Sequence, residues 1–358
     1  MRRAVPDRAR LQLGGGWAAR RDRPEDAQIA GPLLQVRNLT TQFGSARAVD
    51  GVSFDMNPGE TLGIVGESGS GKSITALSIL NLVPEPGKIS GGQILFKNRD
   101  VVSMTSDELL DYRGADVAMI FQDPMTSLNP VLRVGFQIEE AMQAHKRFDT
   151  QQAKARVIPL LERVRIPSPG QRARDFPHQF SGGMRQRAMI AMGLANEPAL
   201  LIADEPTTAL DVTVQAQILE LLKELNRELG TAIILISHNV AVIASLCTRV
   251  IVMYSGRVVE SGPTRQVFDH PEHPYTWALL RSVPRVDERR HERLVSIEGL
   301  PPDLSRMPTG CKFHPRCQFK VERCSRDEPP LEGVAPNQDA RCWVLMRNTT
   351  AEARARLR

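Results

Sequence analysis

The chain has 358 residues, 41% hydrophobic and 24% charged, so it can bury the core of one large domain or of two smaller ones. A net charge of +5 with only 5% aromatic residues is not the pattern of a nucleic-acid-binding protein. No apolar run approaches the ~18 residues that span a bilayer, and the arginine-rich start has no signal-peptide core. We therefore expect a cytoplasmic chain whose five cysteines form no disulfides.

Residues 1–32 are expected to be a disordered basic arm. The first thirty residues hold seven arginines and three consecutive glycines but few apolar residues, a composition that cannot bury a core. Contact of this arm with anionic lipid head groups is the alternative interpretation.

Strand and helix patterns alternate from residue 33 to about 265, which predicts an α/β core with a parallel sheet. A helical pattern at 124–195 interrupts this alternation and predicts a helical subdomain. The expected strands lie at 33–43, 48–60, 61–65, 91–98, 118–121, 199–203, 231–237 and, as a hairpin, 249–262. The main expected helices lie at 73–83, 212–229 and 239–247.

The sequence GESGSGKS matches the phosphate-loop pattern G-x-x-x-x-G-K-[ST] and lies between an expected strand and an expected helix. In such a loop the backbone N–H groups surround the phosphates of a nucleotide, the lysine reaches the β and γ phosphates, and the last hydroxyl binds Mg²⁺. The predicted nucleotide-binding residues are Gly66, Glu67, Ser68, Gly69, Ser70, Gly71, Lys72 and Ser73.

Polar residues end three other expected strands. Asp204 and Glu205 follow five apolar residues, and two adjacent carboxylates there are costly unless a cation is near. We expect Asp204 to bind Mg²⁺ and Glu205 to polarise the attacking water. Because the carboxyl ends of parallel strands form the ligand crevice, His238 is a candidate sensor of the γ-phosphate, with Gln122 as a weaker candidate.

A second phosphate-type turn, Ser181-Gly182-Gly183, precedes a helical pattern, so it is expected at a helix N-terminus, which favours anions. The chain thus has two phosphate-binding turns, and the residues alone do not say whose phosphate the second one holds.

Residues 33–265 resemble the ATP-binding domain of ABC transporters, with the family's motifs in the family's order. The resemblance implies a P-loop ATPase fold with a mixed-sheet core, an antiparallel β subdomain and a helical subdomain. It implies that Phe43 stacks on adenine, that Gln122 contacts Mg²⁺, and that Asp211 ends the TTALD motif. Phe180 stands where the family usually has Leu, and Asn239 where it commonly has Asp.

Membership of the ABC transporter family would also explain the Ser181-Gly182-Gly183 turn. In this family two ATPase subunits pair head to tail, and each ATP lies between the P-loop of one and the SGG turn of the other. Ser181, Gly182 and Gly183 would then cap the ATP of a partner subunit, identical or paralogous. A soluble ABC ATPase acting on DNA or ribosomes is the competing class, and a P-loop switch or kinase is a third; a single full motif set without a long heptad run favours a transporter.

The phrases QDPMTSLNP, HPEHPYTWALLRSVP and GCKFHPRCQF resemble the dipeptide and oligopeptide importers of this family. This implies an ATPase on the cytoplasmic face of the inner membrane, acting with two permease chains and, indirectly, an extracytoplasmic solute-binding protein. Relatives also import nickel, glutathione or other small solutes. Residues 266–358 would be the C-terminal extension of this branch, expected as an appendage and not as more sheet.

Four cysteines gather in that extension: Cys311, Cys317, Cys324 and Cys342. Zinc is one possibility, although structural zinc sites usually offer C-x₂₋₄-C pairs and none occurs here. A [4Fe–4S] cluster also suits four thiolates, and the importer resemblance favours it. Four independent buried cysteines fit poorly, because a loop-rich segment with few apolar residues needs a staple. Cys247, in an apolar helix pattern, is expected in the core.

Overall fold

The protein is described here from a computed structural model that covers residues 31–123, 127–208, 210–282 and 297–350. All but the last two residues of the expected basic arm, 1–32, lie outside this range. Within the described part, no helix is both long enough and apolar enough to traverse a bilayer.

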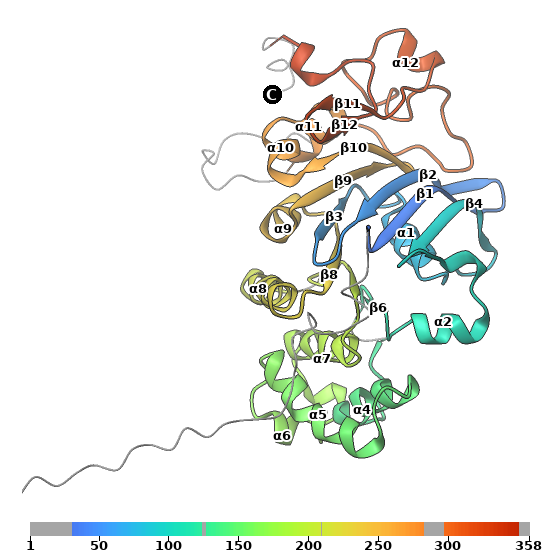
Figure 1. Cartoon of the computed structure of the whole chain (residues 1–358). Coiled ribbons are helices and arrows are strands. Elements are labelled where there is room, and N and C mark those ends of the chain that lie inside the picture. The colour runs from blue at the N-terminus through green and yellow to red at the C-terminus, as the bar shows by residue number, and fades with distance from the viewer. Residues whose placement is uncertain (1–30, 124–126, 209, 283–296, 351–358) are drawn as a thin grey trace, which may run out of the picture.

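The centre of the molecule is an eight-stranded sheet in the order β11-β12-β10-β9-β3-β8-β7-β6 (Figure 1). The five strands from β9 to β6 are parallel, and the remaining pairs are antiparallel. The parallel strands are β3 (Thr61–Val65), β6 (Val117–Ile120), β7 (Leu200–Asp204), β8 (Ala232–Ser237) and β9 (Arg249–Tyr254). Every residue of β3, β7 and β8 is buried, as expected for central strands covered on both faces.

A separate antiparallel sheet in the order β2-β1-β4-β5 lies beside the central sheet. Its strands are β1 (Leu34–Phe43), β2 (Ala46–Met56), β4 (Gly87–Phe96) and β5 (Arg99–Asp100). Helix α1 (Lys72–Ile79) packs between the sheets, and one buried cluster contains Phe54 of β2, Ile79 of α1 and Ile234 of β8. Helix α2 (Ser106–Tyr112) follows and is closed at its start by a capping box between Thr105 and Glu108.

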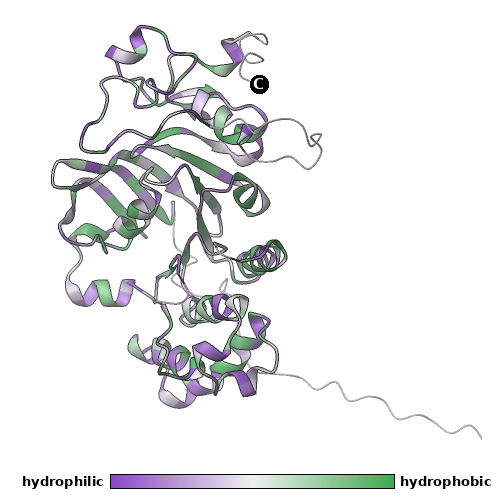
Figure 2. Ribbon diagram, turned by 180° about the vertical axis from the view of Figure 1, so that it is seen from behind, coloured by the Kyte–Doolittle hydropathy of each residue, from purple (hydrophilic) through white to green (hydrophobic). Residues whose placement is uncertain are grey.

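The predicted helical subdomain is confirmed as a group of helices at the β6 edge of the sheet (Figure 1). Its helices are α4 (Val134–Ala144), α5 (Thr150–Arg163), α6 (Pro169–Arg172) and α7 (Gly182–Leu194). The apolar faces of α4, α5 and α7 form one buried cluster with α8 (Val212–Leu229) and α9 (Val240–Leu246). Figure 2 shows polar residues on the outer faces of these helices and apolar residues along the central strands.

The C-terminal extension contradicts one expectation, because it does add strands to the central sheet. Strand β12 (Gln338–Ala340) pairs with β10 (Arg257–Pro263), and β11 (Glu332–Ala335) pairs with β12. The buried carboxylate of Glu260 on β10 fixes this arrangement by accepting hydrogen bonds from the Glu272 and His273 N–H groups and from the Gln338 amide. The extension also contains α10 (Thr264–Asp269), α11 (Pro274–Arg281) and α12 (Arg323–Arg326).

Candidate active site

The predicted phosphate loop lies between β3 and α1, at the carboxyl end of a central strand. Two glycines are required by close contacts: a Cβ at Gly66 would lie 2.2 Å from the Met253 carbonyl oxygen, and one at Gly71 would lie 2.4 Å from that of Ala48. Gly71 also has φ = 99° at the N-terminus of α1, a conformation that favours glycine. The loop therefore presents bare backbone at a helix N-terminus, the arrangement that binds phosphates.

The side chain of Lys72 is directed over this loop. Its Nζ donates to the carbonyl oxygens of Gly66 and Glu67, both at 2.8 Å, and to Ser70 Oγ at 3.3 Å. Burial lowers the pKa of Lys72, and the nearby carboxylates of Glu205 and Asp204 oppose that shift. The ammonium group is thus held where a bound phosphate chain would meet it.

Asp204, the last residue of β7, is 5% exposed. Its Oδ1 is buried and has no hydrogen-bond partner among the described residues, while Ser73 donates a hydrogen bond to the carboxylate. Burial raises the pKa of Asp204. A buried carboxylate oxygen without a partner, beside a hydroxyl, suits a hard cation, so these two residues fit Mg²⁺.

The three expected catalytic residues converge although they come from distant segments. Gln122 Nε2 donates to Glu205 Oε2 at 3.2 Å, and His238 Nδ1 lies 3.0 Å from Glu205 Oε1. Thr208 Oγ1 also donates to Glu205 Oε2 at 2.9 Å. Burial acts to raise the pKa of Glu205, but the contacts with His238 and Thr208 outweigh it, and the pKa is lowered. A carboxylate that stays ionised can accept a proton from water.

The SGG turn begins a helix, as expected, but lies apart from this group. Ser181 is the N-cap of α7, and its Oγ accepts the Met184 N–H. Asp211 caps α8 in the same way through the Val214 N–H. The two caps are neighbours, because a Cβ on Gly183 would lie 2.7 Å from Val214 Cγ1. Among the described interactions, none joins Ser181–Gly183 to the phosphate loop of the same chain.

Phe43 ends β1 on the antiparallel sheet, and its half-buried ring lies against Gly87.

Sequence reasoning missed Tyr275 and Arg316. The Glu67 N–H donates to Tyr275 Oη at 2.8 Å, and Arg316 forms an ion pair with the Glu67 carboxylate. Both residues belong to the extension, more than two hundred residues along the chain, and no local pattern connects them to the loop.

The four clustered cysteines are close enough to influence one another. The charges of Cys311, Cys317 and Cys324 each act on the pKa of Cys342, which is raised mainly by burial. Three of the sulfurs accept a backbone N–H from two residues further along the chain, Cys311 from Phe313, Cys317 from Phe319 and Cys342 from Val344. As placed, however, no group of three or more His, Cys, Asp or Glu within the described residues could hold a metal ion. Cys247 is buried in the core, as expected.

Two family models match the chain: "ABC transporter" over residues 49–208 and "Oligopeptide/dipeptide transporter, C-terminal region" over 259–324. The oligopeptide transport ATP-binding protein OppD of Bacillus subtilis (strain 168) is 48% identical over 318 residues, which cover 87% of this chain and 89% of OppD. The dipeptide transport ATP-binding protein DppD of the same organism is 50% identical over 317 residues, 87% of this chain and 94% of DppD.

Among solved structures, the dimeric structure of MJ0796, a bacterial ABC transporter cassette, superposes with a TM-score of 0.58. It is 29% identical and covers 65% of this chain and 99% of its own. The motifs, their geometry and these matches agree, and the chain belongs to the ABC transporter family, as an ATPase subunit of the oligopeptide and dipeptide branch that couples ATP hydrolysis to transport.

Proposed function

We propose that this chain hydrolyses ATP to drive the import of dipeptides or oligopeptides across the inner membrane. The convergence of Gln122, Glu205 and His238 beside the phosphate loop carries the ATPase part of this proposal. The match of the extension to the oligopeptide and dipeptide region supports the solute class. Residues 33–265 then form the ATP-binding domain and 266–358 the extension.

The geometry of the site and the resemblance to the family support the following residue roles. Backbone N–H groups of Gly66–Ser73 and the Lys72 ammonium hold the phosphates, and Phe43 stacks on adenine. Ser73, Asp204 and Gln122 would hold Mg²⁺, which screens the charge of the phosphate oxygens. Glu205 accepts a proton from the attacking water, and His238 keeps that carboxylate oriented and ionised, since it contacts Oε1 directly.

A head-to-tail pair of ATPase subunits completes each site. The described Ser181–Gly183 turn offers helix N-terminal N–H groups to an anion but has no interaction with its own phosphate loop, which suits a turn that caps the ATP of a partner. Asp211 lies next to it at the same face. The dimeric structure of MJ0796 supports this arrangement. The partner is a second copy or a paralogue.

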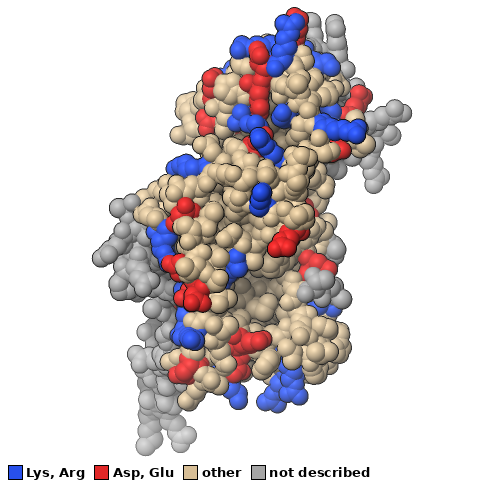
Figure 3. Space-filling view, turned by 90° about the vertical axis from the view of Figure 1, so that its right-hand side faces the viewer, with Lys and Arg blue, Asp and Glu red and all other residues tan. Residues whose placement is uncertain are grey.

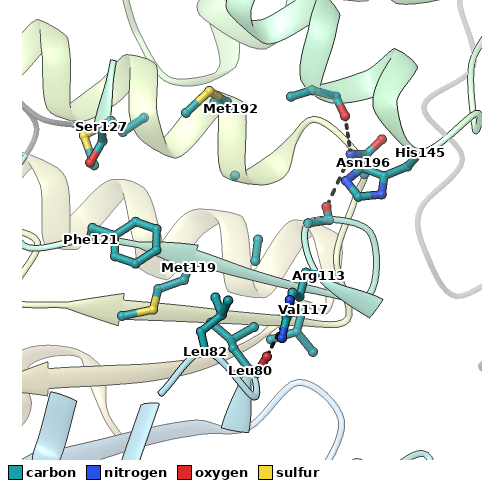
Figure 4. A pocket seen from close by; sticks show the side chains of 15 residues that line it. Leu80, Leu82, Arg113, Val117, Met119, Phe121, Ser127, His145, Met192 and Asn196 are labelled. Carbon is teal, nitrogen blue, oxygen red and sulfur yellow. Dashed lines mark hydrogen bonds between the residues drawn. The ribbon is translucent and has the colours of Figure 1, made fainter. Parts of the chain in front are cut away.

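An apolar cavity of about 540 Å³ is the proposed contact for a permease chain (Figure 4). It lies between the β6 edge of the sheet and the helical subdomain, and Phe121 and Ser127, which flank the Gln122 segment, line it. Two of its polar residues donate hydrogen bonds within the chain, Arg113 to the Leu80 carbonyl and Asn196 to that of Ala141, while the buried Asn196 Oδ1 has no partner among the described residues. An apolar segment inserted here would therefore contact the loop that carries Gln122.

A peripheral position on the cytoplasmic face of the inner membrane follows from such permease contacts. On the face shown in Figure 3, basic and acidic side chains are interspersed, without the single-sign patch that nucleic acid would need. An extracytoplasmic solute-binding protein takes part only indirectly, through the permeases.

The four cysteines are proposed to hold a [4Fe–4S] cluster with a structural role. The resemblance to the peptide importers supports this proposal, together with the backbone N–H groups directed at three of the sulfurs. As placed, the described side chains do not form a metal-binding group, so the four thiols would have to draw together around the cluster. Anaerobically purified protein should be brown, absorb near ~400 nm and contain iron and sulfide. Colourless protein with one equivalent of zinc would instead establish a zinc site, and metal-free protein with an ordered extension would rule out both.

The function is tested by reconstituting the chain with candidate permease and solute-binding proteins of the same organism. Peptide should stimulate ATP hydrolysis and accumulate in vesicles, with Phe121→Asp as a variant that binds ATP but no longer associates with the permeases. Stimulation by nickel or glutathione but not by peptides would change the solute. Purification from membranes without any permease chain would point to a non-transport ABC ATPase.

A further inference from the structure

Arg316 of the extension reaches the phosphate loop. Arg316 Nη1 and Nη2 donate to the two carboxylate oxygens of Glu67 at 2.6 and 3.0 Å, a two-pronged ion pair. The remaining donors are used as well: Nε donates to the Glu298 carbonyl at 3.0 Å, and Nη2 also to that of Ile297 at 3.1 Å. The arginine side chain is only 5% exposed, so its position is fixed.

Glu67 connects Arg316 to Lys72, the lysine expected to bind the phosphates. Its carbonyl oxygen accepts a hydrogen bond from Lys72 Nζ at 2.8 Å, and its N–H donates to Tyr275 Oη at 2.8 Å. The second residue of the loop is therefore held through its carboxylate, its N–H and its carbonyl. Two of these three partners, Arg316 and Tyr275, come from the extension.

An aromatic cluster supports both of these partners. The ring of Tyr275 lies 4.7 Å from that of Tyr254 and 5.4 Å from that of Phe313, measured between centroids. Arg316 lies over the Tyr254 ring at 5.9 Å and directly precedes Cys317 in the chain. The arginine is thus anchored by packed rings, which resist displacement of the loop when ligand binds.

The ion pair between Arg316 and Glu67 also changes the charge of the phosphate loop. Glu67 places a carboxylate inside a loop built to receive a polyphosphate, and like charges at a few ångströms repel more strongly where water is partly excluded. Arg316 neutralises the carboxylate and binds both of its oxygens. Without the arginine, the same carboxylate would be free to oppose the phosphates and to attract Lys72.

We propose that Arg316 is a positioning residue for ATP binding, which acts through Glu67 to hold the phosphate loop and to remove a negative charge from it. The extension thereby sets the ATP affinity of the subunit to which it belongs. This role does not depend on which solute is imported or on what the four cysteines hold.

The test uses the purified full-length chain and a fluorescent ATP analogue. Arg316→Met should weaken binding about tenfold or more at low salt, and the loss should be smaller for the ADP analogue, which carries less charge. Salt near 1 M should reduce the loss, because it screens a repulsion between partly exposed groups. The ATP affinity of Arg316→Lys should lie between those of the parent and of Arg316→Met, since an ammonium cannot form the two-pronged pair. Arg326→Ala, which removes an exposed arginine of the same extension, is the control.

The decisive protein is the double variant Glu67→Gln/Arg316→Met. It lacks both charges, so ATP affinity should recover most of the loss seen in Arg316→Met, a non-additive result expected only of coupled residues. The remaining loss, up to about threefold, measures the lost hold on the loop. Equal losses in the double and single variants would reduce Arg316 to a packing role and overturn the proposal, as would unchanged affinity in Arg316→Met. If Arg316→Met does not fold, the double variant must still fold and bind ATP, and its failure would count against the proposal.

Discussion

Glu205 Oε1 and His238 Nδ1 lie 3.0 Å apart, although the two residues follow different strands of the sheet, β7 and β8. The strands are parallel neighbours, with Ala203 opposite Leu235, so residues just beyond their carboxyl ends meet at one edge. Glu205 has φ = 47°, a turn that directs its carboxylate toward His238 and Gln122. The proposed base is therefore held by contacts within the chain.

Glu205→Gln should bind ATP with near-normal affinity and lose at least about 100-fold in kcat, because only the proton acceptor is removed. ATP hydrolysis in the assembled transporter measures the loss, and size-exclusion chromatography should show an ATP-trapped dimer. Glu220→Gln, on the exposed side of α8, is the matched control. Turnover at the parent rate in Glu205→Gln would exclude this residue as the base.

Ser181→Arg should leave the chain's own ATP affinity nearly intact and block ATP-driven dimerisation, because a long side chain fills the approach to the SGG turn. Ser181 also caps α7, so part of any effect could come from about 1 kcal/mol of lost capping. Ser181→Ala removes the cap without the bulk and separates the two causes. Normal dimerisation and hydrolysis by Ser181→Arg would contradict the shared site.

In Asp204→Asn, Mg²⁺ should no longer increase the affinity for ATP. The buried Oδ1 has no described partner to lose, and a neutral amide is a poor Mg²⁺ ligand. Titrations with and without EDTA should show affinity that depends on Mg²⁺ in the parent but nearly equal values in the variant. A preserved Mg²⁺ dependence would place the ion elsewhere.

Acid should destabilise the extension through His273. Burial lowers the pKa of His273 from 6.5 to about 3, so between these values the unfolded chain binds the extra proton. Stability is then present above pH 6.5 and falls with pH through this window, by at most about 1.4 kcal/mol per pH unit for one proton.

Substitution of His273 by Asn keeps an acceptor for the Tyr275 N–H that His273 Nδ1 now accepts, but does not titrate. The difference in Tm between pH 7 and pH 5 should be smaller in His273→Asn than in the parent. Equal differences would mean that His273 is not protonated on unfolding in this range.

The active site was predictable because its residues are tied to strong local patterns. Buried parallel strands are recognisable in the sequence as apolar runs. The polar residues that follow such strands lie at one edge of the sheet, so the sequence alone predicts that Glu205 and His238 are close together. The phosphate loop was identified by its glycines, whose missing Cβ atoms the structure explains at Gly66 and Gly71.

Features that depend on distant or very short segments were not predictable. Strand β12 has three residues and shows no alternation, so its place in the sheet is decided by Glu260, 78 residues before Gln338. Helix α1 was expected to run to Val83 but ends at Ile79. There Asn81 takes φ = 50°, and the Leu82 N–H donates to the Leu77 carbonyl, a local closure that the apolar pattern conceals.

The pairing of β12 with β10 means that the extension is not a module that can be exchanged on its own. Its strands β12 and β11 extend the central sheet beyond β10, its Gln338 donates a hydrogen bond to Glu260, and its Tyr275 and Arg316 contact Glu67. A chimera joined at residue 265 would combine an ATP-binding domain and an extension whose contact residues do not match. Glu67 has to be transferred with Arg316 and Tyr275, and Glu260 with Gln338, because a graft that moves Arg316 without Glu67 buries a charge with no partner.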